Sequence, residues 1–102
     1  MRGKMRVVPV TQIEYITADG PYATLHVGTH RYVIRESIRQ LALKLDPERF
    51  VRIHRSTIVR LDLVDALLRS EGSEYRVQLE GGVRLRVGRS WREALERRLG
   101  RS

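Results

Sequence analysis

The chain has 102 residues, the size of one domain, and its formal net charge is +8. It contains no cysteine, which excludes disulfide bonds and thiolate metal sites and is compatible with a reducing cytosol. No apolar stretch approaches the length of a membrane span. We therefore predict one cytoplasmic domain that does not enter a membrane and whose partner is a polyanion.

The positive charge is concentrated in two separate segments. Residues 49–60 carry four arginines and no acid, and residues 84–102 carry seven arginines against two glutamates. Arginine outnumbers lysine 18 to two, and its planar fork of donors suits phosphate oxygens and guanine edges. A codon bias toward arginine is the alternative explanation. The two segments would form one basic surface if the fold brings them together.

Short strands and turns fill the first third of the chain. A two-residue turn at Gly28-Thr29 predicts a hairpin between the last two of these strands. The Asp19-Gly20-Pro21 turn leaves Tyr22 exposed in a loop, where it could contact a base or a phosphate or pack over its own turn. Pro9 favours an edge position or an early end for the first strand. In chain order, the four predicted strands are Arg6–Val10, Ile13–Thr17, Ala23–Val27 and His30–Arg35.

A helix is predicted after these strands. Ser37 and Gln40 form a capping-box pattern, and Asp46-Pro47 ends the segment. The apolar residues recur at helical spacing. They are Ile38, Leu41, Ala42 and Leu45.

The next segment places a polar tripeptide, His54-Arg55-Ser56, between two apolar β-like stretches. If residues 51–63 formed one strand, alternation would place Arg55 on the buried face. An unpaired buried guanidinium is too unfavourable, so we predict that the strand ends or turns near Arg55. With Arg52 and Arg60 on either side, this cluster favours anion binding. A hydrogen-bonded turn with a solvated arginine is the structural alternative.

A second hairpin and a helix complete the chain. Strands are predicted at Val64–Arg69, Tyr75–Leu79 and Val83–Val87, and the last two pair across Glu80-Gly81-Gly82. Alternation places the apolar residues of this hairpin on one face. The opposite face carries Arg76, Arg84 and Arg86.

The last predicted helix begins with a second capping-box pattern, Ser90 with Glu93. Arg89 immediately precedes it. Because the first amides of a helix are free, this position favours a bound phosphate. For Ser90, the role of helix N-cap is the alternative to a contact with a ligand.

Enzyme chemistry is not predicted. His26 and His30 flank a hairpin turn but lack further metal ligands, so no metal and no cofactor is expected. Ser56, His54 and Asp62 lack a nucleophile elbow and an oxyanion hole.

Four motifs in order resemble the LytTR DNA-binding domain of bacterial transcription and response regulators. Ile13–Tyr22 looks like its opening segment and Arg35–Leu41 its helix. Phe50–Val59 is similar to its central "RiHRS" segment and Val83–Ser90 to its closing strand. The match covers about residues 6–99 of this single domain.

The resemblance implies a mostly β, elongated antiparallel fold of about ten short strands in three sheets, with one short helix between sheets and a short C-terminal helix. It implies sequence-specific binding of double-stranded DNA through loops in successive major grooves, often at direct repeats, where a second copy can bind. The family's contacts fall on Tyr22, Arg55 and Arg89. Arg52, His54, Ser56, Arg60 and Ser90 complete the predicted DNA-binding residues.

Two positions depart from the family pattern. Arg60 stands where the family usually has Asn, and Gly88 stands where it usually has Ser. The family's domains usually follow a receiver or sensory domain, so the chain is expected to be either an excised domain or a stand-alone regulator. The alternatives to DNA are an RNA-binding basic β module, disfavoured by the few aromatic residues, and a protein-interaction domain for an acidic partner.

Overall fold

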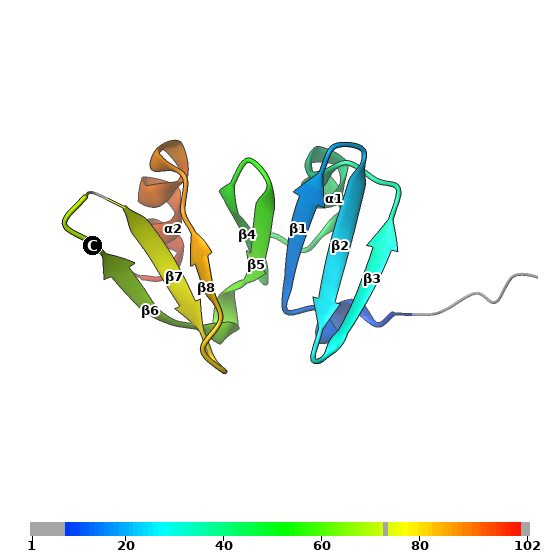
Figure 1. Ribbon diagram of the computed structural model, residues 1–102, viewed down its shortest axis with the longest axis horizontal. Coiled ribbons are helices and arrows are strands. Elements are labelled where there is room, and N and C mark those ends of the chain that lie inside the picture. The colour runs from blue at the N-terminus through cyan, green and yellow to red at the C-terminus, as the bar shows by residue number, and fades with distance from the viewer. Residues whose placement is uncertain (1–7, 73, 101–102) are drawn as a thin grey trace, which may run out of the picture.

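Two antiparallel sheets stand side by side along the long axis of the molecule (Figure 1). The computed structural model describes residues 8–72 and 74–100 of the chain, and its principal dimensions are 54 × 25 × 24 Å. The predicted mostly β, antiparallel and elongated architecture is confirmed. The described residues form eight strands in two sheets, whereas about ten strands in three sheets were expected.

The larger sheet has the strand order β3-β2-β1-β5-β4. The predicted hairpin across Gly28-Thr29 is confirmed, since β2 and β3 pair there with Val27 opposite His30. Gly28 has a φ of 59°, which suits glycine at a two-residue turn. The strands are β1 (Tyr15–Asp19), β2 (Tyr22–Val27), β3 (His30–Ile34), β4 (Phe50–His54) and β5 (Thr57–Arg60).

One pairing explains why there are fewer sheets than expected. Tyr15 of β1 lies opposite Val59 of β5, so the β1–β3 meander and the β4–β5 hairpin form one continuous sheet. The first predicted strand is also wrong within the described residues, because Val10–Gln12 form a 3-10 turn, η1. Arg6 and Val7 of that strand lie outside the described residues.

Helix α1 (Ile38–Lys44) covers one face of this sheet and closes the first core. The Ser37 side chain accepts a hydrogen bond from the Gln40 backbone N–H at 3.1 Å, as the capping pattern predicted. Because α1 connects β3 to β4, two strands of the same sheet, it does not lie between sheets. The buried residues of this core are Ile13, Ile16, Ala23, Leu25, Ile38, Leu41, Phe50 and Ile58.

The smaller sheet and the C-terminal helix enclose a second core. Its strands are β6 (Val64–Arg69), β7 (Tyr75–Leu79) and β8 (Arg84–Arg86), and the 3-10 turn η2 (Leu61–Leu63) leads into it. Helix α2 (Arg92–Arg98) packs Leu95, which has no exposed surface, into this core. The buried residues are Val51, Ile53, Val59, Tyr75, Val77, Leu79, Val87 and Leu95.

The β4–β5 hairpin contributes to both cores. In β5, Ile58 packs in the first core and its neighbour Val59 in the second. Successive side chains of a strand point to opposite faces, so a strand buried on both sides has apolar residues in succession, as at Ile58 and Val59. This hairpin therefore lies in the middle of the molecule (Figure 1), and its turn is held from both sides.

The second capping box was predicted wrongly. Residues Arg89–Trp91 form a 3-10 turn, η3, and α2 begins after it with Trp91 at the N-cap position and no side-chain cap. Ser90 lies within η3 and is exposed. The residues that the pattern assigned to the start of the helix form the 3-10 turn instead.

Candidate nucleic-acid interface

The β4–β5 turn presents Arg55 to solvent. The register between β4 and β5 shifts between Arg52 and His54. This irregularity interrupts the regular alternation of inward and outward side chains before Arg55. Ile53 is completely buried, whereas Arg55 is exposed. The predicted turn near Arg55 is confirmed, and the guanidinium avoids the interior as the cost of its burial requires.

His54 and Ser56 brace this turn from within. The Ser56 backbone N–H donates to His54 Nδ1 at 3.2 Å, and the Ser56 hydroxyl lies 3.0 Å from the same nitrogen. Because a backbone N–H can only donate, Nδ1 is an acceptor and the proton of the neutral ring is on Nε2. Both side chains are partly buried, so their first role here is to hold the backbone on which Arg55 stands.

The guanidinium of Arg52 lies beneath the same turn. Nε donates to the His54 carbonyl oxygen at 3.2 Å and Nη2 to the Arg55 carbonyl oxygen at 2.6 Å. Its Cζ lies 4.8 Å from the centroid of the Trp91 ring. Burial lowers the pKa of Arg52, and the positive charge of Arg39 lowers it further. Arg52 was predicted to contact DNA. In the structure its guanidinium contacts the turn and Trp91 instead.

Gly88 joins this turn to the segment that carries Arg89. The Gly88 N–H donates to the Ile53 carbonyl oxygen at 2.7 Å, and the Trp91 N–H donates to the Gly88 carbonyl oxygen at 2.9 Å. A Cβ on Gly88 would lie 2.6 Å from Trp91 Cδ1, closer than van der Waals contact allows. The absence of a Cβ at this position therefore accommodates the indole of Trp91.

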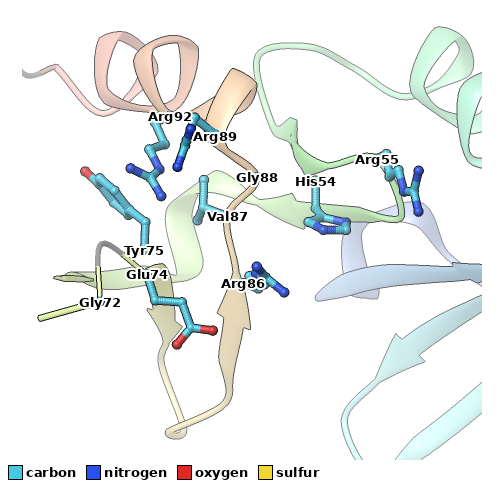
Figure 2. A pocket seen from close by; sticks show the side chains of 10 residues that line it. All are labelled: His54, Arg55, Gly72, Glu74, Tyr75, Arg86, Val87, Gly88, Arg89 and Arg92. Atoms are coloured by element: carbon cyan, nitrogen blue, oxygen red, sulfur yellow. The ribbon is translucent and has the colours of Figure 1, made fainter. Parts of the chain in front are cut away.

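Arg55 and Arg89 line one open pocket of about 510 Å³ (Figure 2). Its lining includes four arginines, His54 and a single acid, Glu74. The fold thus brings residues of the two basic segments to one pocket, which was the condition for a single basic surface. The four arginines are Arg55, Arg86, Arg89 and Arg92.

Arg86 and Arg92 were not among the predicted site residues. The alternation in the last hairpin had indicated that Arg86 points away from the core, but a position on one face does not reveal its neighbours. Arg92 lies with its Cζ 5.0 Å from the Tyr75 ring centroid, and the Tyr75 hydroxyl donates to Glu96 of α2. No sequence signal identified Arg92, because its place depends on how α2 packs on the sheet.

Tyr22 lies apart from the arginine pocket but at the same edge of the molecule. It was predicted in a loop, but it is the first residue of β2, directly across the hairpin from Asp19, and 45% of its surface is exposed. Arg35 donates to its hydroxyl at 3.2 Å. Figure 1 shows the β1–β2 turn and the β4–β5 turn at one edge, with the chain passing from β8 into α2 along it. The Ala18 N–H donates to the Ser56 carbonyl oxygen at 2.9 Å and ties the two turns together.

Arg60 is not brought to this edge. It lies at the far end of β5 from the turn, with 18% of its side chain exposed and its Nε 2.8 Å from Asp62 Oδ1. Nη1 donates to the carbonyl oxygens of Thr11 and Ile13. Arg60 therefore fastens the η1 segment to β5.

Other kinds of site have little support in the described residues. Among residues 8–72 and 74–100, no three His, Cys, Asp or Glu side chains are grouped as metal ligands would be. The helices described there are also too short and polar for any of them to cross a bilayer.

The chain matches the model of a known family. The family model described as the LytTr DNA-binding domain matches residues 3–100. The LytTr DNA-binding domain of a methyl-accepting/DNA response regulator from Bacillus cereus superimposes with a TM-score of 0.81, covering 91% of this chain and 85% of that one at 22% identity. At this identity the superposition establishes a common fold.

Curated relatives are longer proteins. An uncharacterized response regulatory protein of Vibrio cholerae is 30% identical over 76% of this chain, which spans 31% of that protein. The transcriptional regulatory protein LytR of Staphylococcus aureus is 31% identical over 95% of this chain, which spans 39% of it. The CO-responsive transcriptional regulator RcoM of Rhodospirillum rubrum is 32% identical over 81% of this chain, which spans 36% of it.

Proposed function

Because the chain belongs to the LytTr DNA-binding domain family, we propose that it binds duplex DNA sequence-specifically and thereby regulates transcription. The observation that carries this proposal is the pocket that Arg55 and Arg89 both line, at the edge that also holds the Tyr22 hairpin. Its named relatives are response or transcriptional regulators, and we propose the same class of role for this chain.

Arg55 and Arg89 are the proposed base readers. Both are exposed and stand on turns anchored to sheets. An arginine fork donates to O6 and N7 of guanine in the major groove, the commonest specific contact between protein and DNA. Two forks on rigid supports suit this task better than two lysines would, because bidentate geometry discriminates between bases.

The remaining predicted residues take different proposed roles. Tyr22 would contact a base edge or the backbone, and Ser90, exposed beside Arg89, would contact a phosphate. His54 presents an Nε2–H donor from the pocket wall, while Ser56 holds its ring. Arg52 positions the turn from beneath, and we leave Arg60 out of the interface because its guanidinium is engaged with Asp62, Thr11 and Ile13.

The dimensions support contacts in more than one groove. The long axis of 54 Å exceeds the helical repeat of DNA, about 34 Å, and the proposed contacts are spread along that axis (Figure 1). We propose that the turns enter successive major grooves from one side of the duplex. Direct repeats would allow two copies to bind next to one another without an extensive interface between them.

Selection of bound duplexes from a random DNA pool tests the proposal. A recovered sequence motif, bound more tightly than its scrambled version in the presence of heparin, is the expected result. Equal competition by heparin and by the selected duplex would favour an acidic protein partner instead. Preferential competition by single-stranded RNA would favour RNA binding.

A further inference from the structure

The outward face of the small sheet carries a second group of arginines, Arg76, Arg84 and Arg86, which we call the arginine face. All three are exposed. Arg76 of β7 lies directly opposite Arg86 of β8, and Arg84 lies opposite Gln78. Since residues that face one another across paired strands share a face of the sheet, the three side chains project together on the side away from the second core.

This arrangement is unfavourable for the free protein. Like charges directly opposite one another on neighbouring strands destabilise a sheet. Arg76 has Glu74 at 3.2 Å, and the Nε of Arg84 donates to the Gln78 side chain at 3.0 Å. In the described part of the chain, neither Arg84 nor Arg86 forms an ion pair with an acid. The packing of the sheet offers no reason for this face to be basic, so the reason is sought in a partner.

The arginine face is continuous with the pocket of Arg55 and Arg89. Arg86 lines that pocket, as does Glu74 (Figure 2). Glu74 also lines a second depression of about 280 Å³ together with Arg76 and Arg84. The two depressions therefore adjoin at Glu74, whose carboxylate is paired with Arg76, and a polyanion bound at the pocket can continue onto the sheet.

We propose that the arginine face holds the phosphate backbone of the same duplex, next to the base pairs that Arg55 and Arg89 read. The inference rests on the proposed function, to which it adds a second contact surface with a different task. The face lies on β7 and β8, which extend between the edge formed by the turns and the opposite edge of the molecule (Figure 1). It therefore lies beside the projecting turns that would enter a groove, where the sugar-phosphate backbone passes.

The composition of the face favours a duplex over a single strand. Binding of single strands relies on aromatic side chains on which bases stack. The side chains that share this face are polar or aliphatic, because the aromatic residue of β7, Tyr75, is 5% exposed and packs in the second core. Exposed guanidinium groups without a stacking platform suit phosphate oxygens.

The test compares Arg76→Gln/Arg84→Gln with the parent on a selected duplex and on its scrambled version over a range of salt concentrations. Each phosphate contact contributes a slope of about 0.9 to the dependence of log K on log salt, so its loss weakens binding roughly eightfold at 0.1 M salt. We expect a salt slope lower by about two and a similar loss of affinity for both duplexes. Arg31→Gln, an exposed arginine of β3 at the other end of the molecule, loses one charge and is the matched control for the single variant Arg84→Gln.

Two further variants exclude indirect effects. Arg84→Lys keeps the charge and should retain the parent's salt slope, while Arg84→Gln alone should lower it by about one. The thermal midpoint of the double variant should not fall. Its Arg76→Gln change removes one of the two like charges, Arg76 and Arg86, that lie opposite one another on β7 and β8.

The outcomes separate this inference from the proposed function. An unchanged salt slope, or a loss confined to the selected duplex, would overturn the phosphate role while specific binding by the parent stands. A parent that binds no duplex would overturn the proposed function and this inference with it.

Discussion

Arg52 and Trp91 connect the two segments that carry the proposed base readers. The guanidinium of Arg52 donates to the carbonyl oxygens of the β4–β5 turn and lies 4.8 Å from the centroid of the Trp91 ring. Trp91 in turn packs on Gly88, whose N–H donates to Ile53. The relative placement of Arg55 and Arg89 therefore depends on side chains that need not touch DNA.

Arg52→Lys is expected to lower specificity while the charge of the protein is unchanged. Lysine cannot reproduce the planar fork that bonds two carbonyl oxygens and stacks on indole. We expect a loss of about 1–3 kcal/mol in unfolding free energy, measured with denaturant, because two hydrogen bonds from a charged donor are disrupted. The ratio of affinities for selected and scrambled duplexes should also fall. Arg39→Lys, an exposed residue of α1, should leave both quantities unchanged.

Gly88→Ser, which introduces the residue usual in the family, is expected to destabilise the protein by about 1–3 kcal/mol. The added Cβ would lie 2.6 Å from Trp91 Cδ1, and overpacking of this kind displaces side chains or backbone. A double-mutant cycle with Trp91→Leu measures the coupling. If the smaller partner leaves the cost of Gly88→Ser unchanged, the explanation through Trp91 is incorrect.

Arg55→Ala and Arg89→Ala should each reduce affinity for a selected duplex by about 1–3 kcal/mol and relax the preference at one base pair. Both side chains are exposed, so unfolding curves should remain those of the parent. Arg31→Ala serves as the matched control. Retention of parental affinity and sequence preference by both variants would remove the assignment of these residues as base readers.

Arg60→Gln is expected to affect stability and not the salt dependence of DNA binding. Its guanidinium bonds the carbonyl oxygens of Thr11 and Ile13 and pairs with Asp62. Leaving such acceptors unsatisfied lowers the free energy of unfolding by about 1–3 kcal/mol. A decrease of about one in the salt slope, measured by titration of a duplex at several salt concentrations, would instead indicate a phosphate contact.

His26 should make the free energy of unfolding depend on pH. Burial lowers its pKa below the usual 6.5, the charge of Arg31 lowers it further, and Glu14 acts in the opposite direction. The unfolded chain therefore takes up the proton first, so the contribution is present above about pH 6.5 and is lost as the pH falls toward the folded pKa. The ring also stacks on Tyr15 with centroids 4.0 Å apart and lies 3.0 Å from the Thr17 hydroxyl.

Denaturant unfolding between about pH 7.5 and 5 measures this effect. The parent should lose more stability on acidification than His26→Gln, which has no titrating group at this position. Parallel pH profiles for the two proteins would contradict the assignment to His26.

Local features were predictable because they depend on neighbours in the sequence. The Ser37 cap needs only the Gln40 amide three residues away, and the hairpin at Gly28 needs only a residue that accepts positive φ. The turn near Arg55 followed from the cost of burying a charge on an alternating strand. The segment around Ser90 was predicted less well, since a 3-10 turn and an α-helix place similar demands on a short sequence.

The sequence by itself determined most of the strands and turns and the presence of two arginine-rich segments, because alternation, turn chemistry and charge are encoded in successive residues. Only the tertiary structure decided which of these meet. The pairing of Tyr15 with Val59 joined two groups of strands into one sheet, and the packing of α2 brought Arg92 beside Arg89. Arg60 and Arg55 carry the same charge, yet the first fastens the chain and the second faces solvent. The reason is physical: a guanidinium bonds whatever acceptors the fold places near it, and those at Thr11 and Ile13 are distant in sequence.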